Sequence, residues 1–481
     1  MKYIRLLWFL ALFAAVAPMC AHAGDVTINI DEKKVLFTTP ADFHGNNFVA
    51  LWNNTGDSPG AVKAFSQLGA TLVRFPGGVP AEWYDWKEPL ATGFTVITPE
   101  AAWKFAKNAN ASMVFQTNAA QDKTGVNKKT KEPYKLDSSG AHTAGWATWA
   151  KEKNVKVAFW EIGNEPEMDA PAPNKKSQED IYKWYNAKFE EQARAIKEAD
   201  SSTKIMGPAS ANTWYWWHEK NLEKFMVAEG NKTGTGLVDA VSIHWYPDGG
   251  TAPFEKNRGA AQGWTKCMNY IRKTIDANDS RNLPVYITEW NWGAGDHNDS
   301  NSYFGNALGC ADCIGMFLRT GVMGQTHFCL QKVKRGWGVL GMSGDSVPQN
   351  APNPTYYGLA LASHLSGKVL DVKNPVDEAN VMSAYATHNE AGLEVMLINK
   401  SDQPQNVTLA FNKFDPQNKK IQVYTLKSSN GLPSDSTVVY NGVTAPHPQD
   451  SDLPPPTDGA SGGSAFSKTV DPYSMMVVVF K

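Results

Sequence analysis

The sequence predicts an α/β fold, namely a (β/α)8 TIM barrel with an additional all-β sandwich domain. Eight short apolar runs, typical of buried strands, recur along the chain with amphipathic helical segments between them. The runs are 42–48, 71–78, 112–118, 157–165, 204–210, 240–247, 284–291 and 324–330. Eight strand–helix units favour a closed barrel, because an open parallel sheet has no reason to stop at eight.

Helical segments fill the intervals between the strands, and the tail changes its pattern. The helical segments are 60–68, 99–108, 181–199 and 265–277, with 305–320 and 357–365 flanking the last strand. From about residue 369 the apolar residues alternate with period two, which predicts an antiparallel sandwich. Residues 26–37 alternate in the same way, so we expect them to join the sheets of the tail. The predicted domains are a signal peptide at 1–23, the sandwich strand at 24–38, the catalytic barrel at 39–366 and the sandwich at 367–481.

Composition argues for a globular protein with an uncharged partner. The chain has 481 residues, a formal charge of -2 and 42% hydrophobic residues. Such a balance gives no electrostatic footprint for nucleic acid or an anionic membrane, and no stretch of the mature chain is apolar for long enough to span a bilayer. We expect a monomer. The 17 Trp residues either enrich the core or line a cleft that stacks on sugar rings.

The N-terminus resembles a cleavable signal peptide, so we expect a secreted or periplasmic protein. Lys2 and Arg5 precede an apolar run at 6–18, and Ala21-His22-Ala23 offers small residues for cleavage before Gly24. Four cysteines would then remain in an oxidising compartment, with three full pairings open: Cys267, Cys310, Cys313 and Cys329. No second closely spaced ligand pair accompanies Cys310-Ala-Asp-Cys313, so disulfides or buried thiols are favoured over zinc or redox chemistry.

Two glutamates fall where barrel strands meet their loops. Glu165 ends the fourth strand and Glu289 ends the seventh, and barrel chemistry sits at these strand ends. A retaining glycosidase needs two carboxyl groups about 5 to 5.5 Å apart, one as acid and one as nucleophile. A lone glutamate at a strand end is usually a solvated residue or a helix N-terminal charge. The joint placement of two, each beside Trp and Asn, favours catalysis.

Four short motifs carry a resemblance to known enzymes. Ile162-Gly-Asn-Glu-Pro-Glu and Tyr286-Ile-Thr-Glu-Trp-Asn resemble the acid/base and nucleophile signatures of the retaining glycoside hydrolases of clan A. Leu72-Val-Arg-Phe-Pro-Gly-Gly and Tyr84-Asp-Trp-Lys resemble family 51 of that clan. A C-terminal sandwich fed by an N-terminal strand is similar to the layout of families 30, 39, 44, 51 and 79.

The resemblance implies residue roles. It makes Glu165 the acid/base, Glu289 the nucleophile and Asn164 the residue that hydrogen-bonds the sugar 2-hydroxyl. It also makes Arg74 a support for the nucleophile, whose pKa a neighbouring guanidinium should lower.

Further binding residues are expected on the same face of the barrel. His244 and Tyr246 alternate with apolar neighbours on the sixth strand, so both can point into the mouth, and in the clan a His and a Tyr from this strand lie near the nucleophile. We expect Trp290 or Trp292 to form a platform for a sugar ring. Loop aromatics predict an extended cleft: Trp83, Trp86 and the cluster at 214–217.

These observations predict a secreted retaining glycoside hydrolase. We expect it to cleave a neutral β-linked glycan of the glucan or xylan type internally, by double displacement. The alternatives are an exo-acting α-L-arabinofuranosidase and a non-catalytic carbohydrate-binding protein on the same scaffold. The sequence implies no cofactor, and no loop has the ligand spacing of a metal site.

Overall fold

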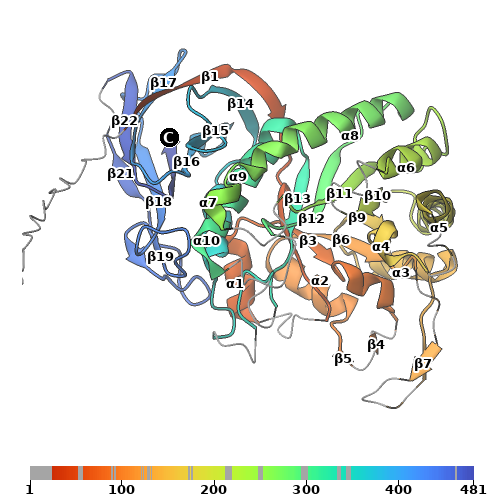
Figure 1. Ribbon diagram of the computed structural model, residues 1–481. Helices are drawn as coiled ribbons and strands as arrows, with labels where there is room; N and C mark the ends of the chain where they lie inside the picture. The colour runs from red at the N-terminus through yellow and green to blue at the C-terminus, as the bar shows by residue number, and fades with distance from the viewer. Residues whose placement is uncertain are drawn as a thin grey trace, which may run out of the picture.

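A computed structural model shows a barrel with a sheet domain beside it (Figure 1). The structure describes residues 24–51, 58–87, 90–91, 94–120, 122, 124–126, 131, 133–171, 174, 177–211, 219–247, 253–293, 302–332, 337–342, 348–460 and 463–481. The predicted signal peptide at 1–23 and the aromatic cluster at 214–217 lie outside these residues.

Eight parallel strands form a closed barrel, which confirms the predicted fold class. In spatial order they are β2 (His44–Asn47), β3 (Leu72–Phe75), β6 (Ser112–Thr117), β9 (Val157–Ile162), β10 (Ile205–Ser210), β11 (Ala240–Trp245), β12 (Val285–Trp290) and β13 (Gly324–His327). The barrel closes where β13 pairs with β2, with Gln325 opposite His44. Each of the eight predicted strands contains one of them.

Side chains of the barrel strands alternate between two apolar layers. One cluster fills the barrel interior near the N-terminal ends of the strands: Leu72, Val114, Phe159, Met206, Ala240 and Tyr286. The other layer faces the surrounding helices, as with Val241, Ile243 and Trp245 on β11. Because the period is two, polar residues that follow the interior cluster along each strand also point inward, toward the mouth.

Helices surround the barrel between successive strands. They are α1 (Pro59–Gln67), α2 (Pro99–Asn108), α3 (Gly140–Glu152), α5 (Gln178–Ala199), α6 (Asn221–Glu229), α8 (Trp264–Asn278), α9 (Phe304–Thr320) and α10 (Pro354–Ala362), with short helices α4 (Pro166–Asp169), α7 (Phe254–Asn257), η1 (Val79–Trp83) and η4 (Ala260–Gly263). Hydroxyl caps start several of them. The side chains of Ser58, Thr98, Ser139 and Ser177 accept the N-terminal backbone N–H groups of α1, α2, α3 and α5.

The sheet domain is one continuous mixed sheet of 11 strands. Its strands are β1 (Gly24–Thr38), β14 (Lys368–Lys373), β15 (Met382–Asn389), β16 (Gly392–Asn399), β17 (Gln405–Phe411), β18 (Ile421–Ser428), β19 (Val438–Tyr440), β20 (Val443–Thr444), β21 (Thr457–Gly459), β22 (Ala465–Val470) and β23 (Ser474–Phe480). The sheet curls over one apolar cluster, and rings from distant strands meet inside it, with the centroids of Phe466 and Phe480 5.7 Å apart.

Strand β1 is an interior strand of this sheet, between β14 and β17, although it precedes the barrel in sequence (Figure 1). It runs antiparallel to β14 and parallel to β17. The prediction that the N-terminal strand joins the sheet of the tail is confirmed, and the strand pairs within the tail are antiparallel as predicted; the parallel β1–β17 pair was not predicted. A strand that arrives from the other end of the chain is free of the hairpin connection that forces consecutive strands to be antiparallel.

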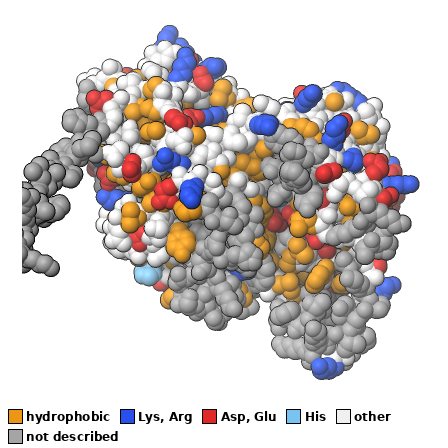
Figure 2. Space-filling model, in the orientation of Figure 1, with side chains coloured by type: hydrophobic (Ala, Val, Ile, Leu, Met, Phe, Trp, Pro, Cys, Tyr) orange, Lys and Arg blue, Asp and Glu red, His pale blue; other side chains and the backbone are white. Residues whose placement is uncertain are grey.

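The four cysteines of the predicted mature chain are all buried. Cys267, Cys310, Cys313 and Cys329 are all buried free thiols, so the disulfide option is wrong and the buried-thiol option holds for these four. Among the described residues no helix has the length and apolar character needed to cross a bilayer. Figure 2 shows cationic and anionic side chains interspersed over the visible face of the described chain.

Candidate active site

A β-bulge in β12 brings Glu289 to the inside of the barrel. Ile243 of β11 lies opposite Ile287, but the next residue, His244, lies opposite Glu289, so β12 contains one extra residue at this point. Tyr286 already points into the interior, and strict alternation from it would place Glu289 on the helix side. The bulge reverses that phase and aims the carboxylate at the mouth, a use of bulges that recurs beside active sites.

Glu165 lies three residues beyond the end of β9, in a turn that leads into α4. Its backbone is left-handed, with φ 37° and ψ 66°, which is strained for a residue other than glycine. Its backbone N–H donates to the carbonyl of Ala209, with N and O 2.9 Å apart. The unusual turn directs the side chain toward β11 and β12 instead of into solvent, and only 9% of Glu165 is exposed.

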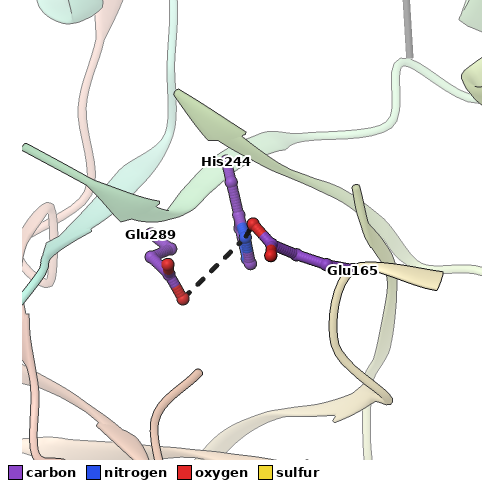
Figure 3. A group of neighbouring side chains, drawn as sticks. All are labelled: Glu165, His244 and Glu289. Carbon is purple, nitrogen blue, oxygen red and sulfur yellow. Dashed lines mark hydrogen bonds and ion pairs between the residues drawn. The ribbon is translucent and has the colours of Figure 1, made fainter. Parts of the chain in front are cut away.

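The two carboxyl groups converge as the sequence predicts. His244 lies between them, and its Nδ1 is 2.9 Å from Oε1 of Glu165 and 3.8 Å from Oε2 of Glu289 (Figure 3). One carboxylate oxygen of each glutamate lies within 4.8 Å of the other. This separation fits the spacing of a retaining glycosidase, about 5 to 5.5 Å between carboxyl groups, and is too short for the wider pair of an inverting enzyme.

Glu289 accepts a hydrogen bond at each oxygen. The hydroxyl of Tyr246 donates to Oε1 at 2.7 Å, and Nη1 of Arg74 donates to Oε2 at 3.1 Å. Two donors favour the ionised carboxylate. Among the described residues the Glu165 side chain receives one hydrogen bond, from His244, so the surroundings of the two acids differ.

Arg74 uses all of its donors within the site. The guanidinium has five N–H groups, and their acceptors are Glu161 at 2.6 Å, Asn47 at 3.0 Å, Glu289 at 3.1 Å, Asn164 at 3.2 Å and Nε2 of His244 at 3.2 Å. The side chain is fully buried, so each contact replaces water that a charged group would otherwise need. Arg74 thereby fixes the positions of residues from four other barrel strands or their loops.

The contact with Arg74 determines the tautomer of His244. Arginine can only donate, so Nε2 of His244 must be the acceptor and the single proton of the neutral ring must sit on Nδ1. The Nδ1–H group then donates to Oε1 of Glu165. Burial lowers the pKa of His244 to about 4, which keeps the ring neutral.

Asn164 is oriented by a similar chain of donors. Its Oδ1 accepts from Nη2 of Arg74 at 3.2 Å and from Nε2 of Gln116 at 2.8 Å. Its Nδ2 donates to Asp169 at 2.9 Å. The second Nδ2 hydrogen has no partner among the described residues and remains available to a ligand.

Burial raises the pKa of both acids. The pKa of Glu165 rises to about 8, through burial first and the negative charge of Glu167 second, against the opposing effect of Arg74. Burial also raises the pKa of Glu289, while His244, Arg74 and the Tyr246 hydroxyl oppose the rise. Arg74 lowers the pKa of the nucleophile as expected, but removal from water has the larger and opposite effect, so the net shift is upward.

The same three side chains have the spacing of a metal site. Ligand atoms of Glu165, His244 and Glu289 lie within 4.8 Å of one another, the one such group among the described residues. A metal would need a lone pair on Nδ1 of His244. The hydrogen bond from Arg74 to Nε2 places a proton on Nδ1 instead, so the residues fit proton transfer better than metal binding.

The two tryptophans after the nucleophile do not line the mouth. Trp290 is fully buried on the helix side of β12, where its indole N–H donates to Gln325, and Trp292 packs against Gly309 of α9. Neither ring can serve as the predicted platform. Since Glu289 points inward, the alternation of the strand turns its neighbour Trp290 outward. Phe328 is the aromatic side chain that lies near the nucleophile. A Cβ added to Gly78 would be 3.0 Å from the Phe328 ring and 3.1 Å from Oε2 of Glu289, so both side chains lie next to Gly78.

The other loop aromatics differ in exposure. Trp83 at the end of η1 is 40% exposed, as a cleft aromatic would be. Trp86 is partly buried and stacks on Trp146, with ring centroids 6.4 Å apart.

Several buried polar residues of the site escaped the sequence analysis: Asn47, Glu82, Gln116, Glu161 and Glu167. Glu161 could have been found, since a charged residue inside an apolar strand needs a buried partner. Glu82 could not, because its carboxylate oxygens accept hydrogen bonds from the backbone N–H groups of Ala119, Ala120 and Asn164. No pattern of side chains in the sequence reveals such contacts.

Comparison with known proteins agrees with this geometry. The family model described as "Glycosyl hydrolases family 39" matches residues 149–307, a stretch that holds both Glu165 and Glu289. A second model, described as "DIM protein", matches residues 1–29. A sequence comparison with curated proteins finds no match.

Solved structures share the whole architecture at low sequence identity. CelM2, a bifunctional glucanase-xylanase from a metagenome library, has a TM-score of 0.69 at 16% identity over 95% of this chain and 99% of its own. A family 51 α-L-arabinofuranosidase from Thermotoga petrophila RKU-1 has 0.71 at 14% identity over 94% and 99%. Cel44A, a family 44 endoglucanase from Clostridium thermocellum, has 0.63 at 16% over 95% and 100%.

These findings confirm the resemblance to clan A. The fold is that of the family 51 and family 44 structures, and the family 39 match covers the segment between the two carboxyl groups. The paired carboxyl groups and the family 39 match over residues 149–307 support a glycoside hydrolase, and its fold is shared with family 51 and family 44 structures.

Proposed function

We propose that the protein is a retaining glycoside hydrolase that cleaves a neutral β-linked glycan internally, with Glu165 as acid/base and Glu289 as nucleophile. The observation that carries the proposal is the approach of one oxygen of each carboxyl group to within 4.8 Å of the other. The unequal hydrogen bonding of the two groups supports the division of roles, because Glu289 has two donors and Glu165 has one.

In the first step an oxygen of Glu289 attacks the anomeric carbon, and the bond to the leaving oxygen breaks. The proton of Glu165 moves to that leaving oxygen, so the aglycone departs as a neutral alcohol. The pKa of about 8 keeps Glu165 protonated at neutral pH. Asn164 offers its free amide hydrogen to the sugar 2-hydroxyl, a contact that strengthens in the oxocarbenium-like transition state.

In the second step water hydrolyses the glycosyl ester. Glu165, now ionised, takes a proton from the water, whose oxygen attacks the anomeric carbon while the ester oxygen of Glu289 leaves. The sugar departs with its original anomeric configuration. Arg74 and Tyr246 hold the released carboxylate in place for the next cycle.

Charge and aromatic exposure support the substrate class. The formal charge of -2 provides no attraction for a polyanion, and the 40% exposed Trp83 offers a ring face near the mouth. The shared fold of CelM2, a glucanase-xylanase, is consistent with glucan or xylan. The shared fold of family 51 arabinofuranosidases keeps an exo-acting α-L-arabinofuranosidase as the second candidate.

Two substitutions test the roles. We expect Glu289→Ala to abolish turnover of every glycoside, because no group remains to form the ester. Glu165→Ala should slow hydrolysis of natural glycan by about 10²- to 10⁴-fold and largely spare the first step on aryl glycosides with good leaving groups, which need little protonation. Glu394→Ala removes a buried glutamate of the sheet domain and serves as control. Full activity on glycan after either active-site change would refute the assignment.

Product analysis decides between the candidates. Incubation with β-glucan, xylan and arabinan, followed by chromatography, should show oligosaccharides and a rapid fall in viscosity. Release of arabinose alone would favour the exo-enzyme. Sugar affinity without any turnover would favour a binding protein.

We also infer export through the segment at 1–23 and a monomeric state. The support is the charged, apolar and small-residue order of that segment. N-terminal sequencing of the exported protein should begin at Gly24, and size-exclusion chromatography should give one chain of about the mass of the mature sequence. A retained N-terminus or a dimer would contradict the respective inference.

A further inference from the structure

Glu167 lies two residues after the acid, in the first turn of α4, and has no assigned role. Its side chain is buried, with 6% of the residue exposed. It accepts hydrogen bonds from the hydroxyl of Tyr182, from Oγ of Ser210 at 2.5 Å, from the N–H of Ala211 at 3.2 Å and from Nδ2 of Asn221 at 3.4 Å. Four donors around one carboxyl group favour its ionised form and oppose the rise in the pKa of Glu167 that burial causes.

These contacts hold the turn that contains Glu165 against the C-terminal end of β10. Glu165 donates its backbone N–H to Ala209, and Glu167 binds the next two residues, Ser210 and Ala211. Both residues of the Glu165–Ala209 backbone hydrogen bond have a strained backbone, since Glu165 has φ 37° and Ala209 has φ 51°. Each left-handed residue costs about 1–2 kcal/mol, so the conformation persists only if its surroundings hold it.

Several charged and titratable groups among the described residues act on Glu165. They are Glu167 of α4, Arg74 of β3, His244 of β11, Tyr246 after β11 and Glu289 of β12. Arg74 is already shared between Glu161 and Glu289, and His244 is neutral. Among the described residues no cation contacts the carboxyl group of Glu167, so its negative charge, once ionised, has no direct counter-charge there.

We propose that Glu167 is a positioning residue for the acid: it holds the strained turn that presents Glu165 and, as a second buried negative charge, keeps Glu165 protonated. The role rests on the proposed function of Glu165 as acid/base. Electrostatics agrees with the geometry, because the charge of Glu167 is, after burial, the largest influence that raises the pKa of Glu165.

The pH profile of kcat/KM tests this role, with Glu167→Gln as the variant. Glutamine keeps the shape and one of the two acceptor oxygens but removes the charge. In the wild type we expect the alkaline limb near pH 8, where Glu165 ionises. In the variant the limb should move to lower pH by about one unit, so activity above neutral pH falls more than activity at pH 5.

Two further variants separate charge from packing. Glu167→Asp keeps the charge and shortens the side chain, so its limb should stay near that of the wild type even if its thermal stability falls. Glu394→Gln removes a buried glutamate that binds Thr387 and Asn389 in the sheet domain, and it should leave the profile unchanged.

A purely structural role for Glu167 would lower stability in both Glu167 variants and leave the alkaline limb in place, and this result would overturn the proposal. Failure of the proposed function looks different. In that case Glu165→Ala would retain activity on glycan, whatever Glu167→Gln does.

Discussion

Arg74 meets five acceptors with its five donors, and a lysine cannot do the same. Arg74→Lys supplies three donors from one nitrogen, so Glu161 or Glu289 would remain buried without its partner. We expect the free energy of unfolding to fall by about 3–5 kcal/mol, as when one partner of a buried ion pair is lost. Urea denaturation measures the change. Stability within 1 kcal/mol of the wild type would contradict this account of the network.

Glu165 should lower the free energy of unfolding as the pH rises. The pKa of Glu165 is about 8 in the folded protein and near its ordinary 4.5 when unfolded, so folding favours the protonated form. The free energy of unfolding therefore declines as the pH rises through this interval. Glu165→Gln has no charge to bury, and its advantage over the wild type should grow from none at pH 4 to about 4–5 kcal/mol above pH 8.

Urea denaturation of both proteins at pH 4, 6 and 8.5 tests this dependence. Other buried acids cancel, because they are present in both proteins. An advantage that is equal at all three pH values would show that folding does not change the pKa of Glu165, and that any gain is one of packing alone.

At the scale of elements, α9 shows how glycines set the distance between the barrel and the sheet domain. A Cβ on Gly315 would lie 2.2 Å from the Tyr385 ring of β15, whereas Gly263, at the start of α8, has open space around it. Gly315→Ala should therefore destabilise the protein by roughly 1–3 kcal/mol through overpacking, despite the helix propensity that it gains. Gly263→Ala should be neutral or stabilise by up to about 1 kcal/mol.

Thermal unfolding compares the pair directly. Both variants make the same chemical change in a helical backbone, so propensity alone predicts the same sign for both. A stabilised Gly315→Ala would mean that α9 can move away from Tyr385 without cost.

The strands were predictable from sequence, and parts of the site were not. Apolar runs bounded by turn residues located all eight barrel strands, because strands buried on both faces leave a nearly continuous hydrophobic signature. The convergence of Glu165 and Glu289 followed from their places at the strand ends. The burial of Trp290 could also have been predicted, since alternation turns the neighbour of an inward Glu289 outward.

What escaped prediction depends on tertiary contacts. The bulge in β12 leaves no mark in the residue pattern, yet it determines which face Glu289 occupies. The rise in the pKa of Glu289 reflects how completely the loops exclude water, which no neighbouring residue in the sequence reports. The parallel β1–β17 pair joins segments from opposite ends of the chain, and alternation is the same in parallel and antiparallel strands.

At the scale of the whole molecule, one buried ion pair joins the two domains. Lys400, just after β16, contacts Asp312 of α9 with Nζ and Oδ2 2.7 Å apart, and both side chains are fully buried. Lys400→Met should lose about 3–5 kcal/mol, because Asp312 keeps its buried charge. The double variant Lys400→Met with Asp312→Leu should recover part of this loss. A double-mutant cycle by calorimetry gives the coupling, and additive losses would show that the two charges act independently.

The position of β1 between β14 and β17 in the sheet domain has a consequence for how the chain is made. The strands that pair with β1, namely β14 and β17, begin at Lys368 and Gln405. During synthesis β1 therefore stays unpaired until the ribosome has added more than three hundred residues. A shortened gene that stops after the last barrel helix would leave β1 permanently without the two strands with which it pairs. Recombinant production of the barrel alone therefore calls for trimming at both ends, since an orphaned apolar strand invites aggregation.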